Sequence, residues 1–310
     1  MIHSTAAADP KRTFDESLFL ESIRLTKPLS EDIRVVVTGS TGRLGREVMH
    51  TFDEAGISCT GIDSAATVEF RKDGDFAHRR ADLTDYGEAI DAISGCDVVV
   101  HLANISYPGF HPDHKTFTQN VGMNYNVFSA ASVLKCRRVI WLSSANVAGI
   151  ERQAHVPERF PITEDQSPRL GSSYALSKSV SELVADHFGL TTATTFVGIR
   201  STLIVYPEEH DHLRADAENA ELRQWHYWSY IDVRDLTSLI LLAVTSTSEE
   251  TTVVNATAAD TILNRSSTEH CAEYFPETPC DIEATTTRSL FSGDKAKQLF
   301  GFEPRWSWRQ

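Results

Sequence analysis

A tyrosine and a lysine four residues apart, Tyr174 and Lys178, are the residues of this chain best suited to chemistry. Side chains with this spacing lie on one face of a helix, so the phenol and the ammonium group can reach one site. Because a nearby positive charge stabilises a phenolate, Tyr174 can serve as a base. A serine pair, Ser143 and Ser144, closes an apolar run about thirty residues upstream, and such a hydroxyl could hold a substrate oxygen while Tyr174 takes its proton. This set predicts redox chemistry on a hydroxyl or a carbonyl.

Taken alone, the spacing is also typical of an ordinary helix surface on which a tyrosine packs against a lysine stem. A glycine-rich segment near the other end of the chain favours the chemical interpretation. A β-branched run over 33–38 leads into Gly39, Gly42 and Gly45 and then into an amphipathic stretch. A strand, a tight turn and a helix start are the context that a dinucleotide motif requires, although a purely structural turn is the alternative. Gly39 would turn the chain, Gly42 would admit a pyrophosphate to the helix N-terminus, and Gly45 would allow close packing.

An aspartate, Asp63, ends the next predicted strand about twenty residues later. A carboxylate there accepts hydrogen bonds from the ribose hydroxyls and repels a 2'-phosphate, so NAD is the expected cofactor. The alternative is a turn or capping aspartate before Ser64. Arg43 and the basic pair at 71–72 keep NADP open.

With these motifs, the chain resembles the extended branch of the short-chain dehydrogenase/reductase superfamily, the NAD-dependent epimerase/dehydratase type. In outline it is most similar to the short, uronate dehydrogenase-like members. The likeness runs from about residue 33 to the last residues. It rests on Thr38–Gly45, Asp63, Asp82–Leu83, His101–Asn104, Asn120–Gly122, Ser143–Val147, and Tyr174 with Lys178.

The resemblance implies a role for each matching residue. Ser144, Tyr174 and Lys178 would be catalytic, Lys178 would also hold the nicotinamide ribose, and Asn120 would anchor the helix beneath the site. Asp82 and Leu83 would meet the adenine. The residues expected to bind the cofactor, besides Tyr174 and Lys178, are Gly39, Thr41, Gly42, Arg43, Leu44, Gly45, Asp63, Asp82, Leu83, Leu102, Ala103 and Asn104.

The segment 222–232 combines four aromatic residues with an arginine. Aromatic faces stack on sugar rings, and an arginine fork binds a carboxylate in two places. Arg223, five residues before Trp228, resembles the substrate-carboxylate arginine of uronate dehydrogenases. The residues expected to bind substrate are Ser106, Ser144, Ala145, Asn146, Arg223 and Trp225. The aromatics could instead close the core, and the residues at 201–206 depart from the expected pattern, so a neutral sugar or other polyol stays open.

Length and composition narrow the function further. At 310 residues, the chain is long enough for one large α/β domain with a smaller substrate-capping part. A formal net charge of -14 argues against nucleic acid and anionic membrane surfaces as partners. The five scattered cysteines are typical of reduced thiols in a cytoplasmic protein, and no apolar run approaches the ~20 residues of a membrane span. His210 and His212 lack a third ligand and are expected to be solvated, so no metal site is predicted.

Alternating strand and helix patterns predict a doubly wound parallel sheet, the Rossmann class of α/β fold, with a small C-terminal substrate-binding lobe. The candidate strands are 33–38, 58–62, 97–102, 138–143, 194–200 and 252–256, and helices are expected over 116–135, 173–187, 231–244 and 294–300. Parallel strands bring their carboxyl ends to one edge, where Asp63, Leu102 and Ser144 would meet.

We expect three regions along the chain. Residues 1–32 form an extension with a short helix over 14–23, residues 33–200 form the NAD-binding core, and residues 201–310 form the small lobe together with elements that complete the core. Helices 116–135 and 173–187 make the dimer contact in relatives, so the resemblance implies a homodimer.

The favoured hypothesis is a cytoplasmic NAD-dependent dehydrogenase that oxidises a hydroxyl of a sugar or sugar acid. The same residues could serve an epimerase or dehydratase that retains its NAD and returns the hydride. A dinucleotide sensor without catalysis is a third possibility, but relatives of that kind tend to lose the tyrosine or the lysine.

Overall fold

The structure, a computed structural model, describes residues 33–65, 77–106, 109, 111–150 and 156–310. The helix expected over 14–23 and the basic pair at 71–72 lie outside the described residues.

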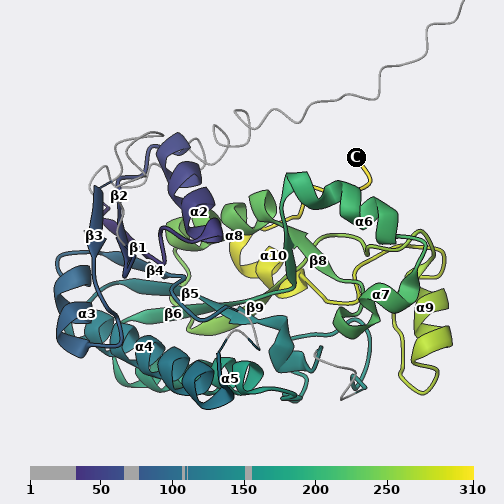
Figure 1. Ribbon diagram of the computed structural model, residues 1–310, viewed down its shortest axis with the longest axis horizontal. Helices are drawn as coiled ribbons and strands as arrows, with labels where there is room; N and C mark the ends of the chain where they lie inside the picture. Colours follow the sequence, from purple (N-terminus) through teal and green to yellow (C-terminus); the bar gives the residue numbers. More distant parts are fainter. Residues whose placement is uncertain (1–32, 66–76, 107–108, 110, 151–155) are drawn as a thin grey trace, which may run out of the picture.

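A seven-stranded parallel sheet forms the centre of the molecule (Figure 1). Its order is β3-β2-β1-β4-β5-β6-β9, so the chain moves outward from β1 in one direction and then restarts at β4 in the other. The strands are β1 (Val35–Thr38), β2 (Cys59–Asp63), β3 (Ala77–Arg80), β4 (Val98–His101), β5 (Arg138–Ser144), β6 (Thr195–Ser201) and β9 (Thr252–Ala256). The prediction of a doubly wound Rossmann sheet is confirmed. Ligands of such sheets bind at the point where the strand order reverses, here between β1 and β4.

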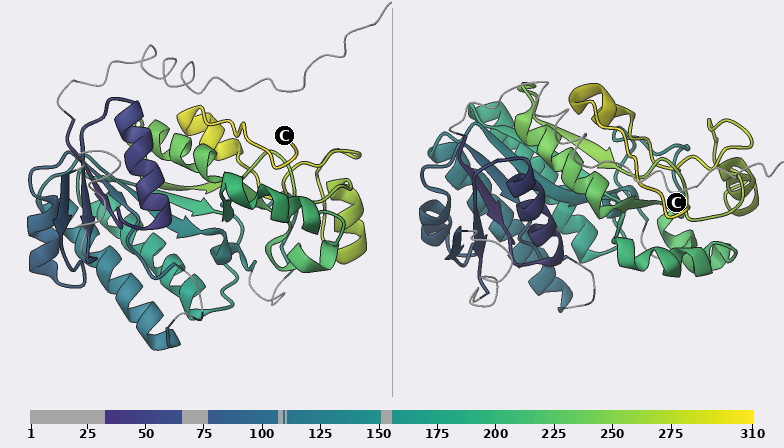
Figure 2. Two further views of the ribbon diagram at one scale, coloured as in Figure 1. Left: turned by 45° about the horizontal axis from the view of Figure 1, so that its top comes forward. Right: turned by 90° about the horizontal axis from the view of Figure 1, so that it is seen from above.

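Helices cover both faces of the sheet (Figures 1 and 2). One face packs on α2 (Arg43–Glu54), α8 (Val233–Thr245) and α10 (Asp294–Phe300). The opposite face packs on α3 (Tyr86–Ile93), α4 (Asp113–Val133) and α5 (Ser173–Thr191).

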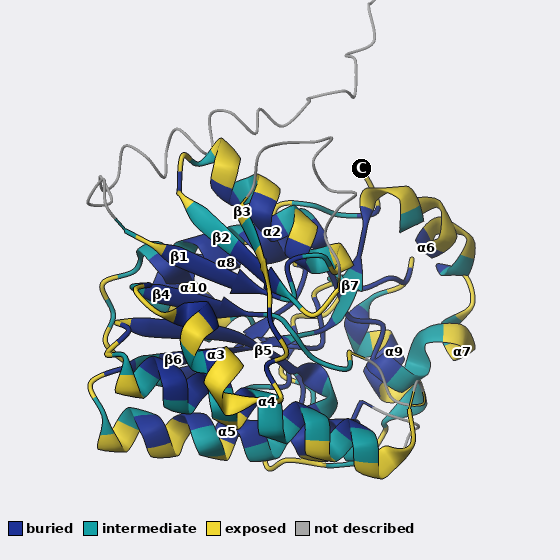
Figure 3. Cartoon of the chain, turned by 60° about the vertical axis from the view of Figure 1, so that its left-hand side comes forward, coloured by how far each residue is buried: buried dark blue, intermediate teal, exposed yellow. Residues whose placement is uncertain are grey.

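Burial on both faces explains the near-continuous apolar strands. Side chains of a strand alternate between faces, so Val35 and Val37 of β1 join the core under α2, and Val36 joins the core under α3 and α4. All four residues of β1 and of β4 are buried. Figure 3 shows these strands as buried, with exposed residues on the outer sides of the helices.

The chain after β6, apart from α8, β9 and α10, builds most of a second lobe beside the sheet, at the right of Figure 1. It contains the parallel pair β7 (Leu203–Val205) and β8 (Tyr230–Asp232). Its helices are η3 (Pro207–Glu209), α6 (His210–Asp216), α7 (Ala220–Arg223), η4 (Gln224–His226) and α9 (Ser267–Tyr274). A separate aromatic core holds this lobe together, with Phe160, Tyr227 and Trp228 at its centre.

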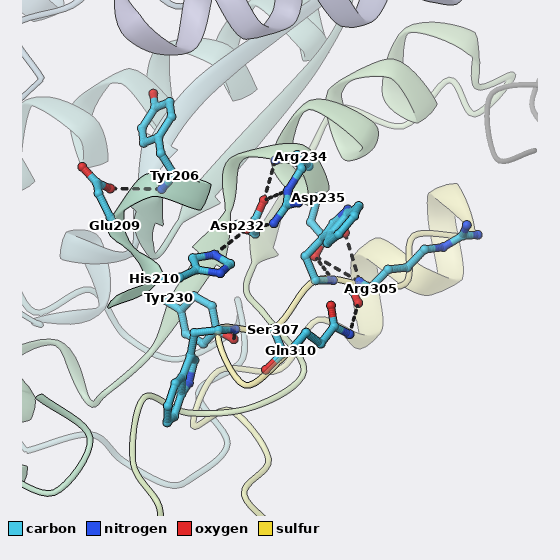
Figure 4. Close-up of polar contacts among 12 residues, drawn as sticks. Tyr206, Glu209, His210, Tyr230, Asp232, Arg234, Asp235, Arg305, Ser307 and Gln310 are labelled. Atoms are coloured by element: carbon cyan, nitrogen blue, oxygen red, sulfur yellow. Dashed lines mark hydrogen bonds and ion pairs between the residues drawn. The ribbon is translucent and has the colours of Figure 1, made fainter. Parts of the chain in front are cut away.

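Two buried aspartates at the start of α8 hold neighbouring segments, Asp232 the helix α6 of the lobe and Asp235 the C-terminal segment (Figure 4). Asp232 caps α8 by accepting from the Arg234 backbone N–H, and its carboxylate also binds the Arg234 guanidinium and His210 Nε2 at 2.7 and 2.8 Å. Asp235 accepts backbone N–H groups of Arg305 and Trp306, and burial raises its pKa to about 7.

The structure corrects two predictions, the start of one helix and the exposure of His210, and adds an edge strand. The helix expected over 231–244 begins only at Val233, because Tyr230–Asp232 pairs with β7 as a strand and Asp232 is the cap. Strand β3 was not predicted, since an edge strand with mostly exposed residues lacks an apolar pattern. His210 is buried against Asp232 rather than solvated. Among the described helices, none is long and apolar enough to cross a membrane.

Candidate active site

One cleft of about 780 Å³ lies at the carboxyl ends of the central strands. Its wall includes the glycine turn after β1, Asp63 after β2, the segment after β4, and Ser144 at the end of β5. Tyr174 and Lys178 of α5 line the same cleft, as does Trp225 of η4. The structure thus brings the two halves of the sequence pattern, the glycines and the Ser-Tyr-Lys set, to one cavity.

The glycine turn fits a dinucleotide phosphate. Gly39 has a positive φ of 68°, and a Cβ there would lie 2.7 Å from the Ala103 nitrogen. A Cβ on Gly45 would overlap the Gly39 carbonyl oxygen. The N-cap of α2, Gly42, has no side-chain cap, so the first turn of the helix keeps backbone N–H groups for an anion.

Asp63 is positioned at the same edge by the turn itself. Its two carboxylate oxygens accept from the backbone N–H groups of Thr41 and Ala65, each at 3.1 Å. A carboxylate has further lone pairs, so Asp63 can also accept ribose hydroxyls. Together with the glycine turn, this donor and acceptor set fits NAD.

Lys178 is a buried cation, only 1% exposed. Its Nζ donates to the Leu142 carbonyl oxygen at 2.7 Å and lies 5.5 Å from the centre of the Tyr174 ring. Burial lowers the pKa of Lys178 to about 7, and the negative charge of Glu182 opposes that shift. The ammonium group is therefore held between β5 and the tyrosine, on the face of α5 that borders the cleft.

The two serines at the end of β5 have different partners. Ser143 donates to Glu182 Oε1 at 2.5 Å, whereas the Ser144 oxygen accepts the Asn146 backbone N–H at 3.2 Å. Ser144 can therefore still donate its own proton to a ligand, while the proton of Ser143 is engaged.

Glu182 also makes a buried, two-pronged ion pair with Arg200 of β6, at 2.8 and 2.7 Å. This pair joins α5, β5 and β6 directly behind the cleft. This ion pair was not predicted, since two charged residues on separate elements give no local signal in the sequence.

Asn120 holds the segment after β4 without lining the cleft. Its amide pairs with both backbone groups of Ile105, at 2.8 and 3.1 Å, and also lies 3.4 Å from the Ser177 hydroxyl of α5. A second buried contact crosses the switch point: His101 bonds Thr38 at 2.6 Å and Asn124 at 2.8 Å. Burial lowers the pKa of His101 to about 3, so the ring is a neutral link.

Most residues predicted for the site line this cleft. They are Gly39, Thr41, Gly42, Leu44, Gly45, Asp63, Asp82, Leu102, Ala103, Asn104, Ser106, Ser144, Asn146, Tyr174, Lys178 and Trp225. Five predicted residues do not line it: Arg43, Leu83, Asn120, Ala145 and Arg223. Leu83 and Ala145 are buried in cores beside the cleft.

The two arginines are held elsewhere by acids. Arg43 binds Glu208 and Glu209, each at 2.6 Å, and stacks on the Tyr206 ring at 3.6 Å. Arg223 binds Asp216 through two nitrogens, at 2.9 and 2.5 Å. The positions expected for a cofactor contact and a substrate-carboxylate contact are thus occupied by ion pairs within the protein.

Several lining residues were not predicted, among them Ser64, Thr84, Gln119, Ser201, Thr202, Leu203, Tyr206 and His226. Ser201 ends β6 and Thr202 follows it, so the rule that sites lie after parallel strands could have identified both. His226 lies within the aromatic segment, but nothing in that pattern separates it from its neighbours. Among the described residues, no group of three or more potential ligands could hold a metal ion.

Comparison with known proteins gives one family match. The model of the NAD dependent epimerase/dehydratase family matches residues 35–256. The 2-alkyl-3-oxoalkanoate reductase of Shewanella oneidensis is 28% identical over 174 residues, which cover 55% of this chain and 43% of the reductase. The chain therefore spans less than half the length of that relative.

Two solved structures share the fold. A short-chain dehydrogenase/reductase superfamily protein from Agrobacterium tumefaciens with bound NAD has a TM-score of 0.68 and 21% identity, covering 89% of this chain and 94% of that one. The uronate dehydrogenase from Agrobacterium tumefaciens has a TM-score of 0.66 and 18% identity, covering 89% and 86%.

The buried ammonium of Lys178 predicts a pH-dependent stability. A lysine whose pKa is lowered in the folded state binds its proton less tightly when the protein is folded. The protonated Lys178 therefore destabilises the fold fully below pH 7, and this effect disappears as the pH rises towards 10.5, the pKa of the lysine in the unfolded chain. Relative to a Lys178→Met variant, the ligand-free protein should gain up to about 1.4 kcal/mol of unfolding free energy per pH unit between pH 7 and 10. Denaturant unfolding of both proteins across this range measures the difference.

The matched control is Lys297→Met, since Lys297 is exposed and pairs with Glu303. Because the control keeps Lys178, the difference in unfolding free energy between the wild type and Lys297→Met should show no such slope between pH 7 and 10. If the difference in unfolding free energy between the wild type and Lys178→Met stays constant with pH, Lys178 is not a buried lysine with a lowered pKa.

Proposed function

The chain belongs to the NAD-dependent epimerase/dehydratase family, and from this premise we propose that it is an oxidoreductase acting on a hydroxyl of a sugar-like substrate. The resemblance to the extended short-chain dehydrogenase/reductase superfamily is confirmed, and NAD is the cofactor of this family. The observation that carries the proposal is the convergence of Ser144, Tyr174 and Lys178 on the cleft that the glycine turn also lines.

In the proposed reaction, NAD bound along the glycine turn would supply the hydride acceptor for the carbon that bears the hydroxyl. Ser144 donates a hydrogen bond to the substrate oxygen and orients it. Tyr174 takes the hydroxyl proton as general base. The Lys178 ammonium, 5.5 Å from the ring centre, stabilises the phenolate form of Tyr174 and is near enough to the cleft to bind the nicotinamide ribose. In the reverse direction Tyr174 returns the proton to a carbonyl oxygen.

Asn120 acts in this scheme as a positioning residue, because it fixes the Ile105 backbone and contacts α5 beside Ser177. The sugar-like substrate is inferred from polar groups in the wall, among them Ser106, Asn146 and Thr202, beside the aromatic face of Trp225. Hydroxyl groups need paired donors and acceptors, and aromatic faces stack on sugar rings. The fold shared with a uronate dehydrogenase is consistent with such a substrate.

One observation favours a second candidate, an epimerase or dehydratase that retains its NAD. The Arg43 guanidinium at the start of α2 is held by Glu208 and Glu209 of the second lobe. These two ion pairs join the start of α2, next to the glycine turn, to the second lobe and would slow the exchange of a bound dinucleotide. Net release of NADH on adding substrate supports a dehydrogenase, and product formation without net NADH supports the second candidate.

Replacing Tyr174 with phenylalanine removes the proposed base and keeps the ring. Turnover should fall at least about 100-fold, because general base catalysis contributes ~10²–10⁴-fold. The measurement is initial rate with NAD and a panel of aldoses, uronates and polyols, repeated with NADP. Coenzyme affinity, followed by fluorescence, should change little.

Tyr86→Phe is the matched control, since Tyr86 is exposed at the start of α3, away from the cleft lining and from the proposed dimer contact. Its turnover should equal that of the wild type. If Tyr174→Phe turns over every accepted substrate at the wild-type rate, the proposed mechanism is wrong.

We also propose that the protein is a homodimer through α4 and α5. Leu176, Leu183 and Leu190 recur every seven residues on α5 and are 41%, 67% and 88% exposed. Tyr125 and Val133 of the adjacent α4 are also more than half exposed. Large apolar side chains gathered on two packed helices are typical of a face that is covered by a partner.

A Leu183→Glu substitution should therefore convert the dimer to a monomer. A buried, unpaired carboxylate at the centre of the contact opposes association. Molar mass by light scattering during size-exclusion chromatography measures the change. The control, Leu222→Glu, changes an equally apolar, 51% exposed position on α7 and should remain dimeric. A wild-type monomer at micromolar concentration would overturn the dimer.

A further inference from the structure

His226, the last residue of η4, is a buried histidine whose two ring nitrogens complete no hydrogen bond of good geometry, although the Ser229 backbone lies near the ring. The residue is 1% exposed and lines the candidate active-site cleft beside Trp225. A buried donor and acceptor without partners lower stability, and at the wall of a cleft a ligand can supply the missing hydrogen bonds.

The backbone that follows His226 is held in an unfavourable conformation. Tyr227 and Trp228 have φ of 52° and 50°, in the left-handed region that bulky residues rarely adopt. Both are buried, Tyr227 packs on Phe160 and Phe275, and the Trp228 Nε1 donates to the Ala220 carbonyl. Strain of this kind persists only when the surroundings impose it, and it gathers at binding sites. The turn has the effect of directing η4 towards the cleft.

The same segment does not bring a cation to the cleft. Arg223 is held by Asp216 and is absent from the lining. Within the described part of the wall, Lys178 is the one lysine or arginine, and its ammonium donates to the Leu142 carbonyl. A substrate carboxylate would therefore have no guanidinium in the wall to pair with, since Arg223, although its charge reaches His226, is paired with Asp216.

We propose that His226 hydrogen-bonds an uncharged exocyclic hydroxyl of the substrate, remote from the reacting carbon, and that the site selects a neutral aldose over the matching uronate. The inference deepens the proposed function and rests on it.

The chemistry of the ring matches that of a hydroxyl. A neutral imidazole has one donor and one acceptor nitrogen, and a hydroxyl can serve both, whereas a carboxylate only accepts. Burial lowers the pKa of His226 to about 3, so the ring stays neutral at working pH. Both ring nitrogens of His226 are covered in the ligand-free protein. Trp225, whose ring lies edge-on to the imidazole at a centroid distance of 4.5 Å, also lines the cleft, so a rotamer change of Trp225 would open His226 to the substrate. Side-chain rotamer changes are common on binding.

The test measures sugar affinity by calorimetry on the full chain saturated with NAD, in the Tyr174→Phe background to prevent turnover. The probes are galactose, glucose and mannose, each with its 6-deoxy form and its uronate, which differ only in a CH₂OH, CH₃ or carboxylate group. In at least one series the aldose should bind ten-fold or more tightly than both of its analogues, as expected of a site that hydrogen-bonds a hydroxyl.

The decisive variant is His226→Leu, which keeps the apolar volume and removes both nitrogens. It should abolish the preference for CH₂OH over CH₃, leave NAD affinity unchanged, and fold with an equal or higher thermal midpoint. His226→Gln keeps a donor and an acceptor and should retain part of the preference. His270→Leu is the matched control, because His270 is also buried with two unpartnered nitrogens but lies outside the cleft lining.

Tighter binding of a uronate, no binding of any of these sugars, or a CH₂OH preference that His226→Leu leaves unchanged would overturn the inference. Because this test measures sugar affinity rather than turnover, failure of the inference can be distinguished from failure of the proposed function. If the protein shows this sugar selectivity but no Tyr174-dependent hydride transfer, only the proposed function is refuted. Hydride transfer that depends on Tyr174, with selectivity insensitive to His226, would refute this inference alone.

Discussion

The buried ammonium group of Lys178 is the constraint on which the site depends. A cation taken out of water must be compensated, and here the Leu142 carbonyl accepts from Nζ while Glu182 lies one turn further along α5. That contact fixes α5 against the end of β5, and these two elements carry Tyr174 and Ser144. The Glu182–Arg200 ion pair extends the same restraint to β6. The ammonium group that we propose as the support of a Tyr174 phenolate thus also sets the geometry of the residues around it.

The parallel sheet supplies the second condition, a cofactor cradle next to that charge. The order reversal between β1 and β4 opens the crevice, and the Thr38–His101–Asn124 contacts hold its two sides and α4 in register. Asn120 fixes the segment that follows β4. The second lobe forms the remaining side of the cleft, through the Arg43 ion pairs with Glu208 and Glu209 and through the strained turn beside His226. The cleft wall therefore combines residues that follow the strands of the sheet with residues of the second lobe, which has its own core.

Much of this arrangement was predictable from sequence because its determinants are local. The β-branched runs, the Gly39–Gly45 spacing and the Tyr174–Lys178 pair each encode their own strand, turn or helix face. The edge strand β3 and the short strand β8 were missed, since one is mostly exposed and the other merges into the apolar pattern of α8. The partners of Arg43 and Arg223 could not be predicted. Each depends on how a loop of the second lobe folds back, and that is decided by tertiary packing.

The most direct test of the account is a crystal structure of the protein with NAD bound. The account predicts that Lys178 Nζ lies within hydrogen-bond reach, about 3 Å, of the nicotinamide ribose, with the Tyr174 and Ser144 hydroxyls facing the nicotinamide ring. It also predicts the pyrophosphate over Gly42 at the start of α2. A nicotinamide bound away from Tyr174, or a Tyr174 hydroxyl turned into the protein interior, would contradict it.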